Sequence, residues 1–106
     1  MKEASCVLVI YNPYDQEYDY MSTWEKSDMQ SIGAFINNIL LMATEYNLGS
    51  LWINDVFFIQ DKVKKWLSID HDICALVALG VAGENPYQRP RKDLCEILID
   101  VNHIGL

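Results

Sequence analysis

Residues 28–46 constrain the fold most, because they combine a long apolar run with a narrow polar stripe. The polar residues recur at intervals of two helical turns, which is typical of an α-helix: Gln30, Ser31, Asn37, Asn38, Thr44 and Glu45. The remaining positions are almost all apolar, and a helix that is apolar over most of its circumference is buried on several sides. We therefore expect a long buried central helix of about 28 Å.

Residue types at the two ends of this segment predict where the helix begins and ends. Ser27 or Asp28 can cap its first turn by accepting a hydrogen bond from a backbone N–H. Asn47 and Gly49 are typical of a helix end. The small residues Gly33 and Ala34 would allow another element to approach the helix closely.

The length of 106 residues favours one domain over residues 1–106. Hydrophobic residues make up 51% of the chain, a composition that excludes a disordered protein. Three Trp, six Tyr and three Phe are many aromatic residues for so small a domain. They indicate a surface for a second copy or a missing domain as well as a core. The alternative is a dense monomeric core.

Apolar runs predict the strands. The runs Ser5–Tyr11 and Ile73–Val81 are typical of strands that are buried on both faces. Residues Ser50–Phe58 predict a short strand, a turn at Asn54-Asp55 and the start of a helix. Leu94–Val101 predicts a last strand. The resulting order, β-α-β-α-β-β, indicates a mixed α/β class with one sheet.

Two further segments allow more than one interpretation. Ile59–Leu67 predicts a second helix, with Val63, Trp66 and Leu67 inward and its three lysines in solvent. Tyr14–Trp24 alternates acidic residues with Tyr and is typical of a solvated loop. The alternative for this loop is a lid whose rings contact a ligand.

The formal net charge of −7 limits the partners. An acidic chain repels nucleic-acid phosphates and anionic lipids, so we expect neither nucleic acid nor a membrane as a partner. No apolar run approaches the length that spans a membrane. Cys6, Cys74 and Cys95 are an odd number at long spacings within apolar runs. We expect them to be reduced and buried, as in a cytoplasmic protein; a redox sensor that uses one of them is a further, weaker hypothesis.

The sequence contains no self-contained catalytic set and no metal-binding pattern. His71 and His103 have no His, Cys or carboxylate at ligand spacing. No nucleophile elbow, phosphate-binding loop or dinucleotide fingerprint is present. Catalysis by this chain would therefore need a cofactor that supplies the reactive atom.

Two segments remain as candidate cofactor contacts. Asn47–Asp55, N-L-G-S-L-W-I-N-D, lies where the long helix meets a strand, and its backbone could line a flat ring. A helix end followed by a strand explains the same residues. Arg89–Lys92, R-P-R-K, is a basic cluster in an acidic chain, in which Arg89 and Arg91 would point to one side of an extended segment and grip a phosphate. The alternative is a solubilising loop.

The order of three segments resembles the second half of the nitroreductase family. The first is Asp28–Ile53, with its amide pair, L-L-x-A stretch and G-S-aromatic junction; the others are Ala75–Gly83, A-L-V-A-L-G-V-A-G, and Pro86–Leu94, P-Y-Q-R-P-R-K-D-L. The resemblance implies an α+β fold with a mixed sheet around the long helix. It also implies that the N-terminal part of the family fold, with its basic R-x-S-x-R segment, is missing from this chain.

The resemblance further implies a flavin enzyme. Members are typically homodimers with FMN at the dimer interface, where NAD(P)H reduces the flavin by hydride transfer and a nitroaromatic or quinone-like acceptor then oxidises it. By position, Trp52, Ile53, Asn54 and Asp55 match the loop beside the flavin ring, although the family usually carries Gly at the Asn54-Asp55 turn. Arg89 and Arg91 match the pair that binds the FMN phosphate, and Asn38 matches a helix amide with a structural contact. The alternative function is a truncated, flavin-free scaffold that dimerises through the long helix.

Overall fold

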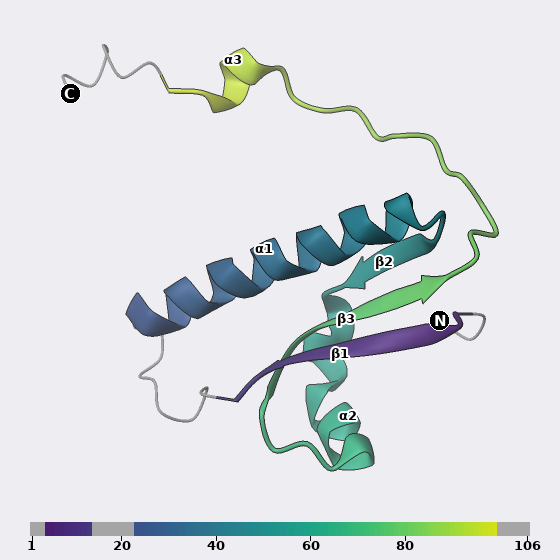
Figure 1. Cartoon of the computed structure of the whole chain (residues 1–106). Coiled ribbons are helices and arrows are strands. Elements are labelled where there is room, and N and C mark those ends of the chain that lie inside the picture. Colours follow the sequence, from purple (N-terminus) through teal and green to yellow (C-terminus); the bar gives the residue numbers. More distant parts are fainter. Residues whose placement is uncertain (1–3, 14–22, 100–106) are drawn as a thin grey trace.

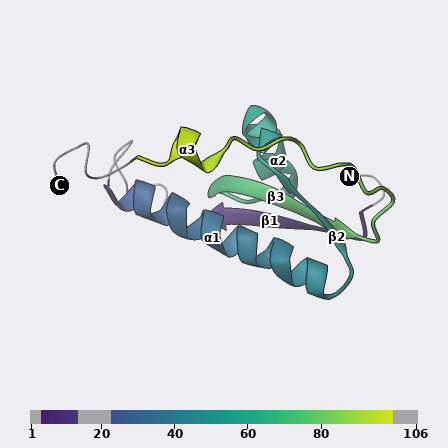
Figure 2. The ribbon, with the colours of Figure 1, turned by 90° about the horizontal axis from the view of Figure 1, so that it is seen from above.

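The described part of the chain folds into a three-stranded antiparallel sheet with helices on both faces. The computed structural model describes residues 4–13 and 23–99. The sheet order is β1-β3-β2, from β1 (Cys6–Asn12), β2 (Gly49–Ile53) and β3 (Asp72–Gly80). The long helix α1 (Thr23–Glu45) covers one face, while the 3-10 helix η2 (Asp55–Ile59) and α2 (Gln60–Leu67) lie on the other (Figures 1 and 2). The predicted α+β class is confirmed, and every described strand pair is antiparallel.

The central strand β3 contributes to two apolar clusters, because successive side chains of a strand point to opposite faces. A register irregularity at Cys74 interrupts this alternation, so that Ile73 lies on the same face as Leu76. Toward α1, Ala75 and Val77 pack with Ile36 of the helix. Toward η2 and α2, Ile73 and Leu76 pack with Val56. Residues 73–78 are all buried. The prediction of a strand that is buried on both faces is therefore confirmed for β3.

The same prediction is wrong for β1. This strand pairs with β3 only, at the edge of the described sheet, and its residues Val7 and Tyr11 are exposed. A continuous apolar run predicts a strand but does not say whether a neighbour covers its second face.

Helix α1 begins earlier than predicted, at Thr23. Ser27 and Asp28 lie inside the helix, where the Ser27 carbonyl oxygen accepts a hydrogen bond from the Ser31 hydroxyl. The Asp28 carboxylate accepts one from the side-chain amide of Asn12, at 3.2 Å, which ties the first part of α1 to the end of β1. Asp28 is thus a tertiary contact and not a cap. Within the predicted loop Tyr14–Trp24, residues 14–22, on which the lid hypothesis depends, lie outside the described part of the chain.

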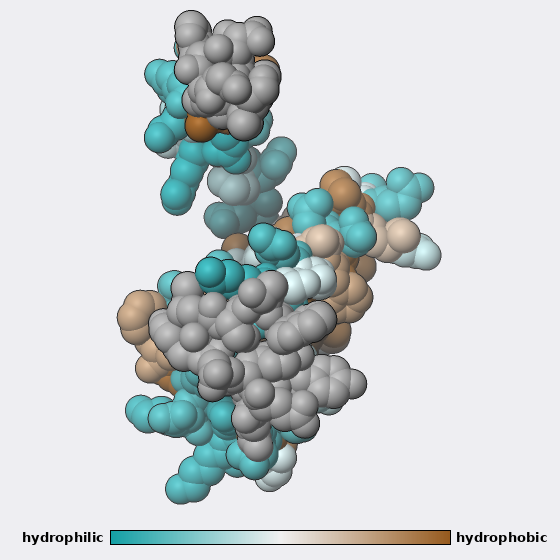
Figure 3. Space-filling model, turned by 90° about the vertical axis from the view of Figure 1, so that its left-hand side faces the viewer, coloured by the Kyte–Doolittle hydropathy of each residue, from teal (hydrophilic) through white to brown (hydrophobic). Residues whose placement is uncertain are grey.

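The prediction that α1 is buried on several sides is wrong as far as the described residues go, because they cover only one side of the helix. Ile36 is 1% exposed against the sheet, whereas Leu41 is 62% exposed. Phe35 and Met42 are also exposed, and Figure 3 shows hydrophobic side chains at the surface of the molecule. The described residues therefore leave a long apolar helix face open.

Helix α2 forms as predicted, but one residue that was predicted to face inward is exposed. Val63 packs against the core cluster of Val56, Ile73 and Leu76, as predicted, but Trp66 is 81% exposed. The preceding η2 adds Phe58, which is 89% exposed. Helical periodicity gave Trp66 an inward position, but α2 is short and contacts the sheet only through the side that carries Val63.

The predicted strand Leu94–Val101 is wrong over Leu94–Ile97, which form the short helix α3. The Leu98 N–H donates to the Leu94 carbonyl at 2.9 Å, so this segment satisfies its backbone locally instead of pairing with a strand. It ends an arm, residues 81–99, whose residues are all exposed. In Figure 1 the arm runs above the rest of the molecule, on the side of β2 and opposite β1.

Two glycines allow a matched test of this packing. A Cβ at Gly49 would lie 3.1 Å from the Ala82 Cβ and 3.2 Å from its Cα, whereas a Cβ at Gly33 would lie 3.8 Å from Trp52 Cη2. We expect Gly49→Ala to lower the free energy of unfolding by about 1 kcal/mol, the low end of the cost of overpacking, because Ala82 lies on the exposed arm and can shift. Gly33→Ala is expected to raise it by about 0.5–1 kcal/mol, because alanine favours the helix. Urea denaturation of both variants checks this, and equal effects would contradict the close approach at Gly49.

Candidate functional site

The loop that follows β2 is the first part of the candidate site. Trp52 pairs with Val77 in the sheet register, and its indole lies toward α1, near Gly33. The indole Nε1–H donates to the Asn54 side-chain oxygen at 2.9 Å, and Trp52 remains 36% exposed. An aromatic ring is thus presented at the surface, with a hydrogen bond at one end and α1 beside the other.

Of the next three residues, one is in the core and two are at the surface. Ile53 packs with the cluster of Val56, Ile73 and Leu76 on the opposite face of the sheet, because it alternates with Trp52. Asn54 and Asp55 are exposed. Asn54 has φ −92° and ψ −21°, a conformation that any residue adopts, so the turn does not need the glycine usual in the family that the sequence resembles.

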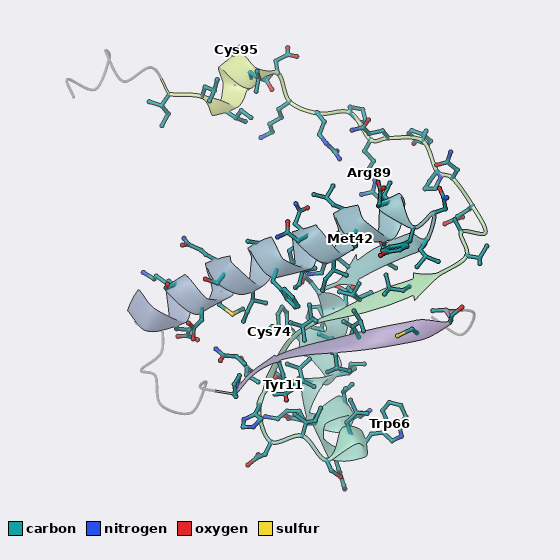
Figure 4. All side chains as sticks on the ribbon, viewed as in Figure 1. Tyr11, Met42, Trp66, Cys74, Arg89 and Cys95 are labelled. Carbon is teal, nitrogen blue, oxygen red and sulfur yellow. The ribbon has the colours of Figure 1, made fainter. Side chains whose placement is uncertain are left out.

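Arg89 and Arg91 form the second part of the candidate site. Both lie exposed on the arm. Arg91 Nη1 donates to the Arg89 carbonyl oxygen at 3.3 Å, so the Arg91 side chain folds back along the arm. Figure 4 shows Arg89 on the arm above the C-terminal part of α1, the part that carries Met42.

The two parts of the predicted site lie on separate segments. Within residues 4–13 and 23–99, no hydrogen bond or ion pair joins Arg89 or Arg91 to residues 52–55. Both segments lie on the β2 side of the sheet (Figure 1). The helix amide Asn38 is exposed on α1.

The chemistry of these residues fits a flavin nucleotide. Exposed guanidinium groups match a phosphate by charge-assisted hydrogen bonds. An exposed indole beside a polar turn matches the edge or face of a planar ring. Ile53 fits less well as a side-chain contact, since its side chain belongs to the core.

Polar groups outside these two segments are the remaining candidates for a catalytic or metal site. The His71 ring stacks on Tyr11 with centroids 5.5 Å apart and an interplanar angle of 7°. Across residues 4–13 and 23–99, no three His, Cys, Asp or Glu side chains lie close enough to hold a metal ion. Within the same residues, no helix combines the length and the apolar character that crossing a bilayer requires.

The prediction of three buried cysteines is wrong for two of them: Cys74 is buried in β3, but Cys6 and Cys95 are exposed. Among residues 4–13 and 23–99, no neighbour covers Cys6 on the edge strand β1 or Cys95 on the arm. We expect Cys6 and Cys95 to react rapidly with a thiol reagent such as Ellman's reagent in the native protein, and Cys74 only after denaturation. Rapid reaction of all three thiols would contradict the burial of Cys74.

Comparison with known proteins identifies the family. The sequence model of the nitroreductase family matches residues 1–81. The chain belongs to the nitroreductase family. This match includes the loop after β2 and ends before Arg89.

A solved structure shares the fold of this nitroreductase-family chain. It is a crystal structure of a candidate nitroreductase in complex with FMN from Desulfovibrio desulfuricans, with a TM-score of 0.77 and 24% sequence identity. The similarity covers 92% of the present chain and 55% of the other, so the present chain spans about half the length of that protein. This confirms the nitroreductase-like fold.

The sequence prediction missed two contacts of the site: the hydrogen bond between Trp52 and Asn54, and the position of the indole beside Gly33. A signal for the first was present, because residues two apart in an extended segment point to the same side. The second joins β2 to α1 across the fold, and neither segment alone indicates it.

Proposed function

We propose that this chain serves an FMN-dependent oxidoreductase of the nitroreductase type. The observation that carries the proposal is the family match over residues 1–81, within which β2 ends in an exposed ring and a polar turn. FMN in this site would accept a hydride from NAD(P)H and reduce an electron-poor acceptor such as a nitroaromatic or a quinone.

The residues divide the binding between them. Arg89 and Arg91 bind the FMN phosphate through charge-assisted hydrogen bonds. Trp52, Asn54 and Asp55 flank the ring, and Ile53 contributes through its backbone while its side chain anchors the loop to the core. None of these residues transfers a proton or forms a covalent bond, so their role is to bind and orient.

The proposal includes a homodimer. The exposed apolar side of α1, with Phe35, Leu41 and Met42, suits a homodimer in which a second copy covers the helix. Reduced thiols in such an enzyme suit the cytoplasm.

The experiment that tests the function is absorbance spectroscopy of the freshly purified chain, followed by titration with FMN and then NADH or NADPH. We expect co-purified flavin absorbance, or saturable FMN binding, and bleaching of the bound flavin on addition of the nicotinamide. A colourless protein with no saturable FMN binding would overturn the proposal.

A second candidate is a flavin-free scaffold that dimerises through α1. It is favoured by the absence, within the described residues, of any hydrogen bond or ion pair between Arg89 or Arg91 and the loop after β2. It predicts a stable colourless dimer in size-exclusion chromatography with light scattering, and no change in that dimer when FMN is added.

A further inference from the structure

A hydrogen bond from Trp52 determines the orientation of the Asn54 side chain. Its oxygen lies 2.9 Å from Trp52 Nε1, and both residues are exposed at the end of β2. The other end of the indole is placed by α1, since a Cβ at Gly33 would lie 3.8 Å from Trp52 Cη2. The indole therefore has a hydrogen bond at one end and lies beside α1 at the other.

The chemistry of the indole determines which way the amide faces. An indole N–H only donates, and an amide offers one accepting oxygen and one donating NH₂ group. The Asn54 oxygen must therefore face Trp52, and its NH₂ group must face away from the indole, toward solvent at the surface of the loop. A glycine at this position would offer no such donor.

We propose that Asn54 is a positioning residue that holds Trp52 and presents its own NH₂ group as an oriented donor to the flavin ring. This inference rests on the proposed function. A reduced flavin ring carries more electron density on its nitrogen and oxygen atoms than the oxidised ring, so a fixed donor stabilises the reduced form more. The expected consequence is a higher reduction potential of the bound flavin.

The first measurement needs no flavin. In an NMR spectrum of ¹⁵N-labelled protein, Trp52→Phe identifies the indole signal of Trp52. We expect Asn54→Ala to increase the hydrogen exchange of this indole N–H severalfold, because its acceptor is lost. Asn54→Asp keeps an accepting oxygen and is expected to retain slow exchange. Unchanged exchange in Asn54→Ala would overturn the inferred hydrogen bond.

The second measurement is the midpoint potential of the FMN-loaded chain. Asn54→Ala and Asn54→Asp both lack the donor, and we expect each to lower the ratio of reduced to oxidised flavin about tenfold at a fixed potential, which is about 30 mV for a two-electron couple. Asn37→Asp, at an exposed amide on α1, controls for the added charge and is expected to leave the potential unchanged.

The outcomes separate this inference from the function on which it rests. FMN binding with a wild-type potential in both Asn54 variants would overturn the positioning role and leave the proposed function intact. Absence of FMN binding in the wild-type chain would overturn the function and the donor role together, while the exchange measurement would still decide whether Asn54 holds Trp52.

Discussion

Changing Arg89 and Arg91 together to alanine is expected to abolish measurable FMN binding while leaving folding nearly intact. Each guanidinium can give charge-assisted hydrogen bonds to the phosphate, of about 1.5–3 kcal/mol each. Loss of one such bond from each arginine corresponds to a rise in Kd on the order of a hundredfold to ten-thousandfold. Both side chains are exposed on the arm, so their loss should change the free energy of unfolding little. Isothermal titration with FMN and urea denaturation provide the two measurements.

A matched variant controls for the charge. Lys62→Ala with Lys65→Ala removes the same two positive charges from exposed positions on α2, away from the arm. This variant should bind FMN as the wild type does. Equal loss of affinity in both double variants would indicate a general electrostatic effect, and unchanged affinity in the arginine variant would show that the phosphate assignment is wrong.

Replacement of Ile36 by alanine is expected to destabilise the fold strongly. Ile36 is 1% exposed and packs with Ala75 and Val77, where α1 meets the central strand. Truncation of such a residue removes buried apolar surface and leaves a cavity, at a cost of about 2–5 kcal/mol in the free energy of unfolding. Chemical denaturation followed by circular dichroism measures this cost.

Asn37→Ala is the control for Ile36→Ala, because it changes the adjacent exposed position on the same helix. Alanine is a better helix former than asparagine, so this variant should be as stable as the wild type or slightly more stable. A loss for Ile36→Ala no larger than the difference between Asn37→Ala and wild type would contradict the placement of Ile36 at the centre of the core.

The sequence predicted those elements whose signal is local. The apolar run around Val77 predicted β3, and the polar pairs that recur every seven residues predicted most of α1. The wrong predictions concern what surrounds an element. The run that contains Cys6 predicted a strand that is buried on both faces, but only neighbouring elements decide burial, and β1 lies at an edge. The β-branched run after Leu94 predicted a strand, but no described strand pairs with it.

The candidate site shows the same division. The resemblance to the nitroreductase family singled out residues 52–55 by order along the chain, and their role at a flavin stays a prediction. It could not show that the Ile53 side chain points into the core, since this depends on which face of β2 meets Val56. The placement of Arg89 and Arg91 relative to that loop depends on an arm with few contacts, and sequence spacing contains no information about it.

The sheet order has a consequence for the order of events during synthesis. Both outer strands pair with β3, which the ribosome makes last of the three. Neither β1 nor β2 therefore has its partner until residues 72–80 have left the ribosome. Pairing between residues this far apart in sequence also slows folding. Until then β1 and β2 expose apolar side chains and unsatisfied backbone groups, so nascent chains that stall before residue 72 are those most exposed to misassembly.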